Sequence, residues 1–231
     1  MKIYGFEKFS MVDYEKKISC TVFTRGCNFR CPFCQNSSLV LPMAQPKEID
    51  EEQVFTYLAE RRHLVDAVCV TGGEPTMQPD LPIFLRRVKD MGFLTKLDTN
   101  GTNPTMLMQL ISDGLLDYVA MDIKNSPENY AKIIGFDTFD IAKVKRSVDI
   151  LLQGKVDYEF RTTLVKQFHT EKDFVSIGKF VVGAKRYFLQ KFADSGDCIE
   201  NNLEEVPKQQ ATKLKDILID SGIADAQLRG Y

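Results

Sequence analysis

The chain has 231 residues, of which 44% are hydrophobic and 27% charged, a composition typical of a globular protein with one large domain or two small ones. A net charge of −2 argues against a protein whose main function is to bind nucleic acid. The sequence has no run of about 18 apolar residues, the length needed to span a membrane. Residues 1–8 also lack the apolar stretch of a secretory signal, so we expect a cytoplasmic protein.

Short apolar strands alternate with amphipathic helices, which is typical of an α/β fold with a parallel sheet. Six strands are predicted, over residues 18–24, 67–71, 93–98, 118–123, 158–165 and 186–191. Helices are predicted over residues 50–63, 81–91, 103–114, 139–153, 172–182 and 207–221, and the tail is expected to add an edge strand. Right-handed crossovers should curl such a sheet into a partial (β/α)6 barrel of the TIM type, with a doubly wound open sheet as the alternative.

Three helix starts carry a recognisable signal. Asp50 lies three residues before Gln53, as a capping pair does. Asn103-Pro104 has a capping residue followed by a proline suited to the first helical position, and Ser126-Pro127 repeats that pattern.

Three of the six cysteines crowd together directly after the first predicted strand. Cys27, Cys31 and Cys34 have the spacing C-x3-C-x2-C, whereas Cys20 and Cys69 lie inside predicted strands. Thiolates hold iron–sulfur clusters, and a [4Fe-4S] cluster usually takes four. Three close thiolates therefore predict a [4Fe-4S] cluster with one iron left open for a ligand such as S-adenosylmethionine (SAM).

The alternative to an open cluster is a closed metal site. A structural zinc site or an electron-transfer cluster would need a fourth ligand, which Cys198, His63 or His169 could supply. Phe33, which precedes the third cysteine of the motif, either packs in the core or covers the cluster near a bound adenine.

Polar residues gather where the predicted strands end, which is where a barrel of this kind places its active site. They are Gly72, Gly73 and Glu74 after the second strand, Asp98 and Thr99 after the third, Asp122 and Lys124 after the fourth, Arg161 in the fifth and Gln190 in the sixth. The glycines would let a ligand approach the backbone, and Glu74 would accept from a cation such as the SAM ammonium. The plainer interpretations are that Asp98 caps a turn and that Arg161 forms a salt bridge in the barrel wall.

Together these motifs resemble the radical SAM activating enzymes of glycyl radical enzymes, above all those of anaerobic ribonucleoside-triphosphate reductase. The resemblance runs from Gly5-Phe6 to about Lys124 and more weakly beyond, with Leu189-Gln190-Lys191-Phe192 similar to the family's last barrel strand. It implies a single radical SAM domain over residues 1–231, with a core barrel over about 17–192 and a C-terminal helix and tail over about 206–231. One departure is Gln35, where the family more often has His.

The resemblance also implies roles for single residues. Cys27, Cys31 and Cys34 would ligate the cluster, and Gly72, Gly73 and Glu74 would hold the SAM amino group. Asp98, Thr99 and Asp122 would bind a monovalent cation, Na⁺ or K⁺, beside the SAM carboxylate, and Lys124 and Arg161 would contact or order SAM.

The activity implied is reductive cleavage of SAM to a 5′-deoxyadenosyl radical, which takes hydrogen from a glycine of a partner enzyme, expected to be an anaerobic ribonucleotide reductase. Flavodoxin or ferredoxin would supply the electron, and neither a membrane nor nucleic acid is expected as a partner. Two other functions remain open: a radical SAM enzyme that modifies a small molecule or RNA, such as a deazapurine synthase, and a non-enzymatic iron–sulfur or zinc module.

Overall fold

The computed structural model describes residues 1–42, 47–194 and 196–231. One eight-stranded sheet runs in the order β1 to β8, with β1 antiparallel to β2 and every later strand parallel to the one before. The strands are β1 Ile3–Ser10, β2 Ser19–Thr24, β3 Ala67–Gly72, β4 Leu94–Thr99, β5 Tyr118–Asp122, β6 Asp157–Leu164, β7 Tyr187–Lys191 and β8 Ala226–Arg229. The strand order follows the chain order, as in a barrel and unlike a doubly wound sheet, in which the order reverses.

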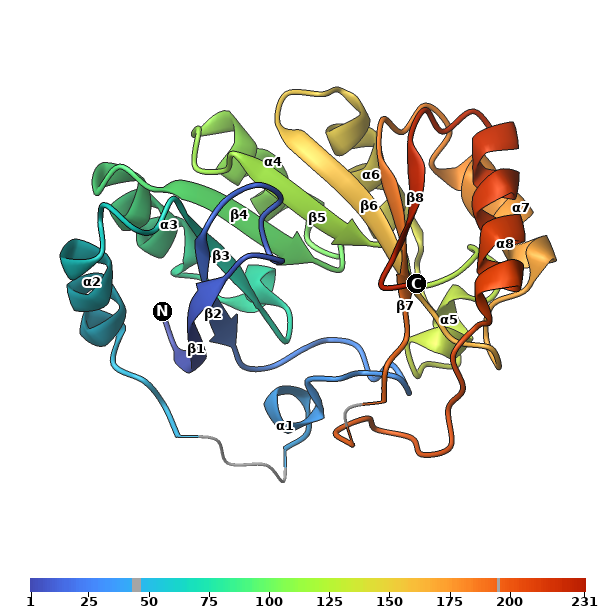
Figure 1. Cartoon of the computed structure of the whole chain (residues 1–231), viewed down its shortest axis with the longest axis horizontal. Coiled ribbons are helices and arrows are strands. Elements are labelled where there is room, and N and C mark those ends of the chain that lie inside the picture. Colours follow the sequence, from blue (N-terminus) through green and yellow to red (C-terminus); the bar gives the residue numbers. More distant parts are fainter. Residues whose placement is uncertain (43–46, 195) are drawn as a thin grey trace.

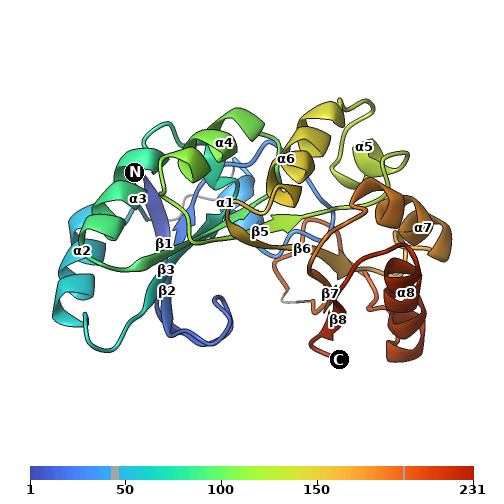
Figure 2. The ribbon, with the colours of Figure 1, turned by 90° about the horizontal axis from the view of Figure 1, so that it is seen from above.

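The longer helices lie along the outer face of the curved sheet (Figures 1 and 2). The helices are α1 Ser37–Val40, α2 Glu51–Glu60, α3 Leu81–Asp90, α4 Pro104–Ser112, α5 Tyr130–Ile133, α6 Ala142–Leu152, α7 Glu171–Phe180 and α8 Lys208–Asp220, with a short 3-10 turn η1 Pro75–Met77. Because β1 and β8 do not pair with each other, the barrel stays open along one side. The prediction of a partial barrel is confirmed, and the six predicted strands are β2 to β7.

The sequence did not predict β1. Only the two ends of this strand are buried, so it lacks the regular alternation that reveals a half-buried strand. The loop that joins β1 to β2 covers the amino-terminal end of the barrel. There the rings of Tyr14 and Tyr118 lie 5.5 Å apart, and the Lys96 ammonium donates to the carbonyl of Asp13. The site must therefore open at the other end.

Two of the three expected helix starts are confirmed. The Asp50 carboxylate accepts from the backbone of Glu52, and Asn103 caps α4. Ser126-Pro127 does not start a helix, because the Ser126 hydroxyl instead donates to Asp173 at 2.9 Å, and α5 begins only at Tyr130.

Asp173 also completes a capping box with Thr170, so one buried carboxylate stabilises the start of α7 and ties it to the loop before α5. Among the described residues, no helix is long and apolar enough to cross a bilayer.

Candidate active site

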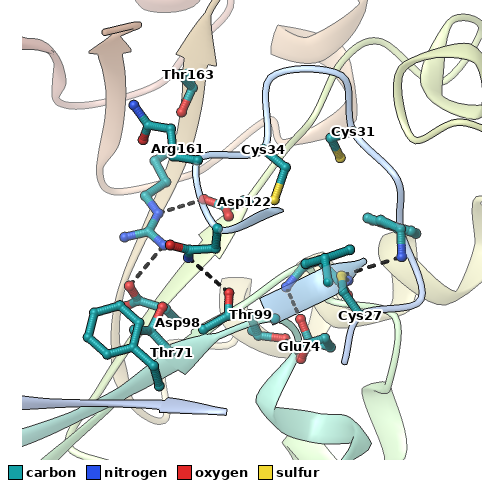
Figure 3. Close-up of a pocket in the computed structure, with 18 of the residues that line it drawn as sticks. Cys27, Cys31, Cys34, Thr71, Glu74, Asp98, Thr99, Asp122, Arg161 and Thr163 are labelled. Carbon is teal, nitrogen blue, oxygen red and sulfur yellow. Dashed lines mark hydrogen bonds and ion pairs between the residues drawn. The ribbon is translucent and has the colours of Figure 1, made fainter. Parts of the chain in front are cut away.

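A cavity of about 320 Å³ opens at the carboxyl ends of the strands. Each of five successive strands contributes at least one polar side chain to its lining, among them Thr71, Asp98, Asp122, Arg161 and Gln190. The cysteine loop forms the opposite wall, and the three sulfurs lie across the cavity from Arg161 and the two aspartates (Figure 3). The prediction that polar strand ends and cysteines meet at one rim is confirmed.

The cysteine loop is held by its backbone. Gly26 has a φ of +90°, which favours glycine, and its N–H donates to Leu39 of α1 at 2.8 Å. The backbone of Arg30 donates to Ile134 at 2.8 Å, and Glu200 donates to Pro32 at 2.9 Å. Contacts from the following helix α1 and from two distant segments therefore hold the backbone of the loop in place.

The thiols fit a cluster better than a single zinc ion. In the described ranges, no three Cys, His, Asp or Glu side chains gather as they would around one ion, with or without Cys198. A zinc site needs its donors around one point, whereas each thiolate of a cubane binds a different iron. His169 is not a free ligand either, because its two ring nitrogens contact the backbone of Val165 and Lys124.

Burial keeps the thiols of Cys27 and Cys31 protonated when no metal is bound, because it raises the pKa of both groups. It raises the pKa of Cys27 to about 11, although the Phe29 N–H that donates to its sulfur at 3.3 Å lowers it, and it raises that of Cys31 to about 12. Metal ligation must therefore displace protons at neutral pH.

Gly72 and Gly73 are required for a different reason than expected. A Cβ on Gly73 would collide with the carbonyl oxygen of Gly26, and one on Gly72 would collide with the backbone of Thr24. Gly73 also donates to Thr24 at 3.0 Å, and Glu74 donates to Gly26 at 2.8 Å. The close approach is thus made by the protein's own cysteine loop, which packs directly on this turn.

Glu74 is 1% exposed, yet it reaches the wall of the cavity. Its Oε1 accepts from the backbone and hydroxyl of Thr76 and, at 2.7 Å, from the Thr99 hydroxyl, while its Oε2 accepts from the Asn100 N–H at 2.7 Å. Burial raises the pKa of Glu74 above its usual value, against the effect of these hydrogen bonds. One lone pair of Oε2 remains for a further donor.

Arg161 forms a salt bridge with both aspartates, as the plainer interpretation held. Its guanidinium lies 3.0 Å from Asp98 and 2.6 Å from Asp122 (Figure 3). Lys124 contacts Asp122 at 2.8 Å, and Lys96 contacts Asp98 at 3.0 Å. Three cations thus neutralise two carboxylates and leave one positive charge in excess.

Ion pairing overrides burial in this network. Burial alone would raise the pKa of Asp122, but Arg161 and Lys124 hold it well below its usual range. Arg161 and Lys96 likewise lower the pKa of Asp98, although burial alone would raise it. Both aspartates are therefore ionised throughout the physiological pH range, as a site for a charged ligand requires.

Phe33 is 5% exposed and packs against Phe168 and His169, with ring centroids 6.0 and 6.2 Å away. It lines the cavity as well, so it is a core residue with one surface toward the site, and its contact with a cluster or an adenine stays a prediction. Gln35 donates to the carbonyl of Ala193 at 2.6 Å and so ties the cysteine loop to the segment after β7.

Three asparagines were missed by the sequence analysis. Asn100 Nδ2 lies 3.9 Å from the Cys27 sulfur and 2.9 Å from Asn28 Oδ1, and Asn36 donates to Gly72 at 3.0 Å. In the sequence, only their positions could have indicated a role. Asn28 and Asn36 lie inside or next to the cysteine motif, and Asn100 lies within Asp98-Thr99-Asn100-Gly101.

A family model described as the radical SAM superfamily matches residues 21–181, which include the cysteine loop and all the strand ends from β2 to β6. The chain belongs to the radical SAM superfamily. It is therefore a radical SAM enzyme, and the family implies a [4Fe-4S] cluster and SAM as cofactors.

Among its relatives is a Methanocaldococcus jannaschii protein named "Putative glycyl-radical enzyme activating enzyme", with 32% identity over 93% of this chain and 89% of the relative. A 7-carboxy-7-deazaguanine synthase of Thermoplasma acidophilum is 27% identical over 67% of this chain and 70% of that protein.

Solved structures share the fold. A domain of the pyruvate-formate lyase-activating enzyme from Bacteroides vulgatus superimposes with a TM-score of 0.56 at 16% identity, over 71% of this chain and 99% of that one. A radical SAM methyltransferase from Sphaerobacter thermophilus gives a TM-score of 0.72 at 14% identity, over 94% of this chain and 67% of that one.

The Gly73 contact yields a test of the cysteine loop. Gly73→Ala should displace the loop at Gly26, so the variant should hold much less iron after anaerobic reconstitution while remaining folded. The control is Gly114→Ala, because a Cβ on Gly114 would meet nothing within 4 Å. Gly114 has a positive φ and Gly73 does not, so the control carries the greater backbone strain and only the Gly73 variant carries the collision. Iron content and circular dichroism report the two effects. Normal iron content in Gly73→Ala would show that the loop does not depend on this contact.

Proposed function

We propose that this radical SAM enzyme is an activating enzyme that installs a glycyl radical on a partner, an anaerobic ribonucleoside-triphosphate reductase. The observation that carries the proposal is the relative named as an activating enzyme, whose similarity extends over nearly the whole of both chains. The open side of the barrel between β1 and β8 supports it, because a loop of another protein could enter there. The further proposal on domains is that residues 1–231 act as a single unit.

Cys27, Cys31 and Cys34 would hold the cluster, which would supply one electron for the cleavage of SAM into methionine and a 5′-deoxyadenosyl radical that would take a hydrogen atom from the target glycine. The chain's own residues bind and orient SAM. Glu74 Oε2 has one free lone pair for the SAM ammonium, and the cations Lys124 and Arg161, which both line the cavity, can share the SAM carboxylate with Asp122. Phe33 provides an apolar surface for the adenine.

A monovalent cation, Na⁺ or K⁺, at Asp98, Thr99 and Asp122 is a further part of the proposal. Arg161 already bridges the two carboxylates, and the Thr99 hydroxyl donates to Glu74. A cation can bind there only if it shares the carboxylates with Arg161 or moves it. The cation effect on SAM binding should therefore depend on the charge of Asp122.

Asp122→Asn is expected to weaken SAM binding about ten-fold or to remove its response to a change from K⁺ to Na⁺, because the variant loses the charge that orders Arg161 and Lys124. The matched control is Asp117→Asn, since Asp117 has a similar exposure (26% against 25%) and pairs with Lys89 away from the cavity. Titration calorimetry in the two salts measures both effects. Unchanged affinity and an unchanged salt response would show that Asp122 only forms ion pairs with Arg161 and Lys124 and takes no part in binding SAM or a cation.

The activation itself is tested by mixing the reduced protein with SAM and an anaerobic ribonucleotide reductase. A doublet in the electron paramagnetic resonance spectrum is expected from the glycyl radical. Deuterium at the target glycine Cα should also appear in 5′-deoxyadenosine. If SAM is cleaved but no glycyl radical enzyme of the same cell gains a radical, the activating function is wrong.

The second candidate is a radical SAM enzyme that modifies a small molecule or RNA. The observation that favours it is the similarity to a 7-carboxy-7-deazaguanine synthase. SAM cleavage stimulated by a deazapurine precursor and not by a glycyl radical enzyme would select this function.

A further inference from the structure

A second groove lies beside the cysteine loop, outside the cavity described above. Met77, Pro79 and Met106 give it an apolar floor, Lys143 and Arg146 of α6 line it as well, and Asn28 belongs to its wall. We call it the basic groove, because none of its lining residues in the described ranges is an Asp or Glu.

The basic groove lies next to a cluster ligand. Asn28 follows Cys27 in the chain, and Asn28 Oδ1 accepts from Asn100 Nδ2, which lies 3.9 Å from the Cys27 sulfur. Asn28 Nδ2 also donates to the Thr102 hydroxyl at 2.9 Å, which fixes this wall. A protein seated in the groove would thus be separated from the Cys27 side of the cluster by little more than one asparagine.

The two sides of the cysteine loop differ in charge. Lys143 and Arg146 are exposed and form no ion pair with described residues, and the exposed Arg30 donates to the backbone carbonyls of Cys27 and Phe29. On the other side, the segment that touches the loop through Ala193 and Glu200 is acidic. Its carboxylates Asp194, Asp197 and Glu200 form no ion pair with described residues, whereas Glu204 and Glu205 pair with Lys166 and Lys191. An acidic protein would be attracted to the groove and repelled from the opposite side.

We propose that the basic groove is the docking site of the protein that reduces the cluster, a small acidic carrier with a flavin. Rapid electron transfer needs a short distance between the two redox groups, and the groove offers it at Cys27. The apolar floor suits the exposed hydrocarbon edge of a flavin, and the cations beside it suit an acidic rim. The inference rests on the cluster that the superfamily implies, and it does not depend on which target the enzyme activates.

The donor gives up one electron and the oxidised cluster gains it. The flavin begins as the anionic hydroquinone and loses only that electron, so no proton is transferred and no covalent bond forms or breaks between the proteins. Docking therefore needs to be only brief, as expected for a contact steered by charge.

The test is a charge reversal, Lys143→Glu with Arg146→Glu, with hydroquinone flavodoxin as the probe. At low salt, the affinity of the reconstituted variant for flavodoxin and the rate of cluster reduction, followed by stopped-flow absorbance, should each fall at least about ten-fold. Salt should weaken the wild-type interaction strongly and that of the variant little. Reduction by dithionite, which needs no docking, should be unchanged. The matched control, Lys179→Glu with Lys213→Glu on α7 and α8, changes the net charge equally at exposed sites and should behave as wild type.

Unchanged binding and reduction by flavodoxin would overturn the proposal, as would an equal loss in the control pair. An equal fall in the rate of cluster reduction with flavodoxin and with dithionite would show that the substitutions damage the cluster, and this result would also contradict the proposal. A protein that accepts electrons through the groove but activates no glycine would leave this proposal standing and refute the proposed function.

Discussion

The carboxylate of Glu74 is buried where the ends of β3 and β4 meet the cysteine loop, and it can stay there because it accepts four hydrogen bonds. Its backbone N–H donates in turn to Gly26, at the start of the loop. Gly73 allows this contact because it has no side chain. The position of the three thiols relative to the strand ends thus depends on this turn together with the backbone contacts of Arg30 and Pro32, and the cavity depends on that position.

Opposite the thiols, the barrel wall carries buried charges that are stable only as a group. Removing one partner from such a network leaves an unpaired buried charge, which is costly. Arg161 has the central place because it contacts Asp98 and Asp122 together. The arrangement places the cations Lys124 and Arg161 and one free lone pair of Glu74 in the same cavity, which suits a ligand with both a carboxylate and an ammonium.

Much of this could be predicted from the sequence, because alternating strands and helices and polar strand ends are local patterns. The cysteine spacing and the polar residues of β3 to β7 did converge on one cavity. The predictions that were wrong concern residues whose contacts are made by parts of the chain distant in the sequence. Ser126 has the sequence of a cap, but Asp173 from α7 takes its hydroxyl. Gly73 was expected to make room for a ligand, yet the neighbour that needs the room is Gly26, which lies 47 positions earlier and touches it only in the folded chain.

The central claim is that Cys27, Cys31 and Cys34 hold a cluster with an open iron at which SAM is cleaved. Anaerobic reconstitution followed by iron analysis and assay of 5′-deoxyadenosine tests it most directly. The wild type should bind about four irons per chain and cleave SAM. Cys31→Ala should lose cleavage, whereas Cys20→Ala and Cys69→Ala should keep the cluster, since both lie buried inside strands. Full SAM cleavage by Cys31→Ala would contradict the account.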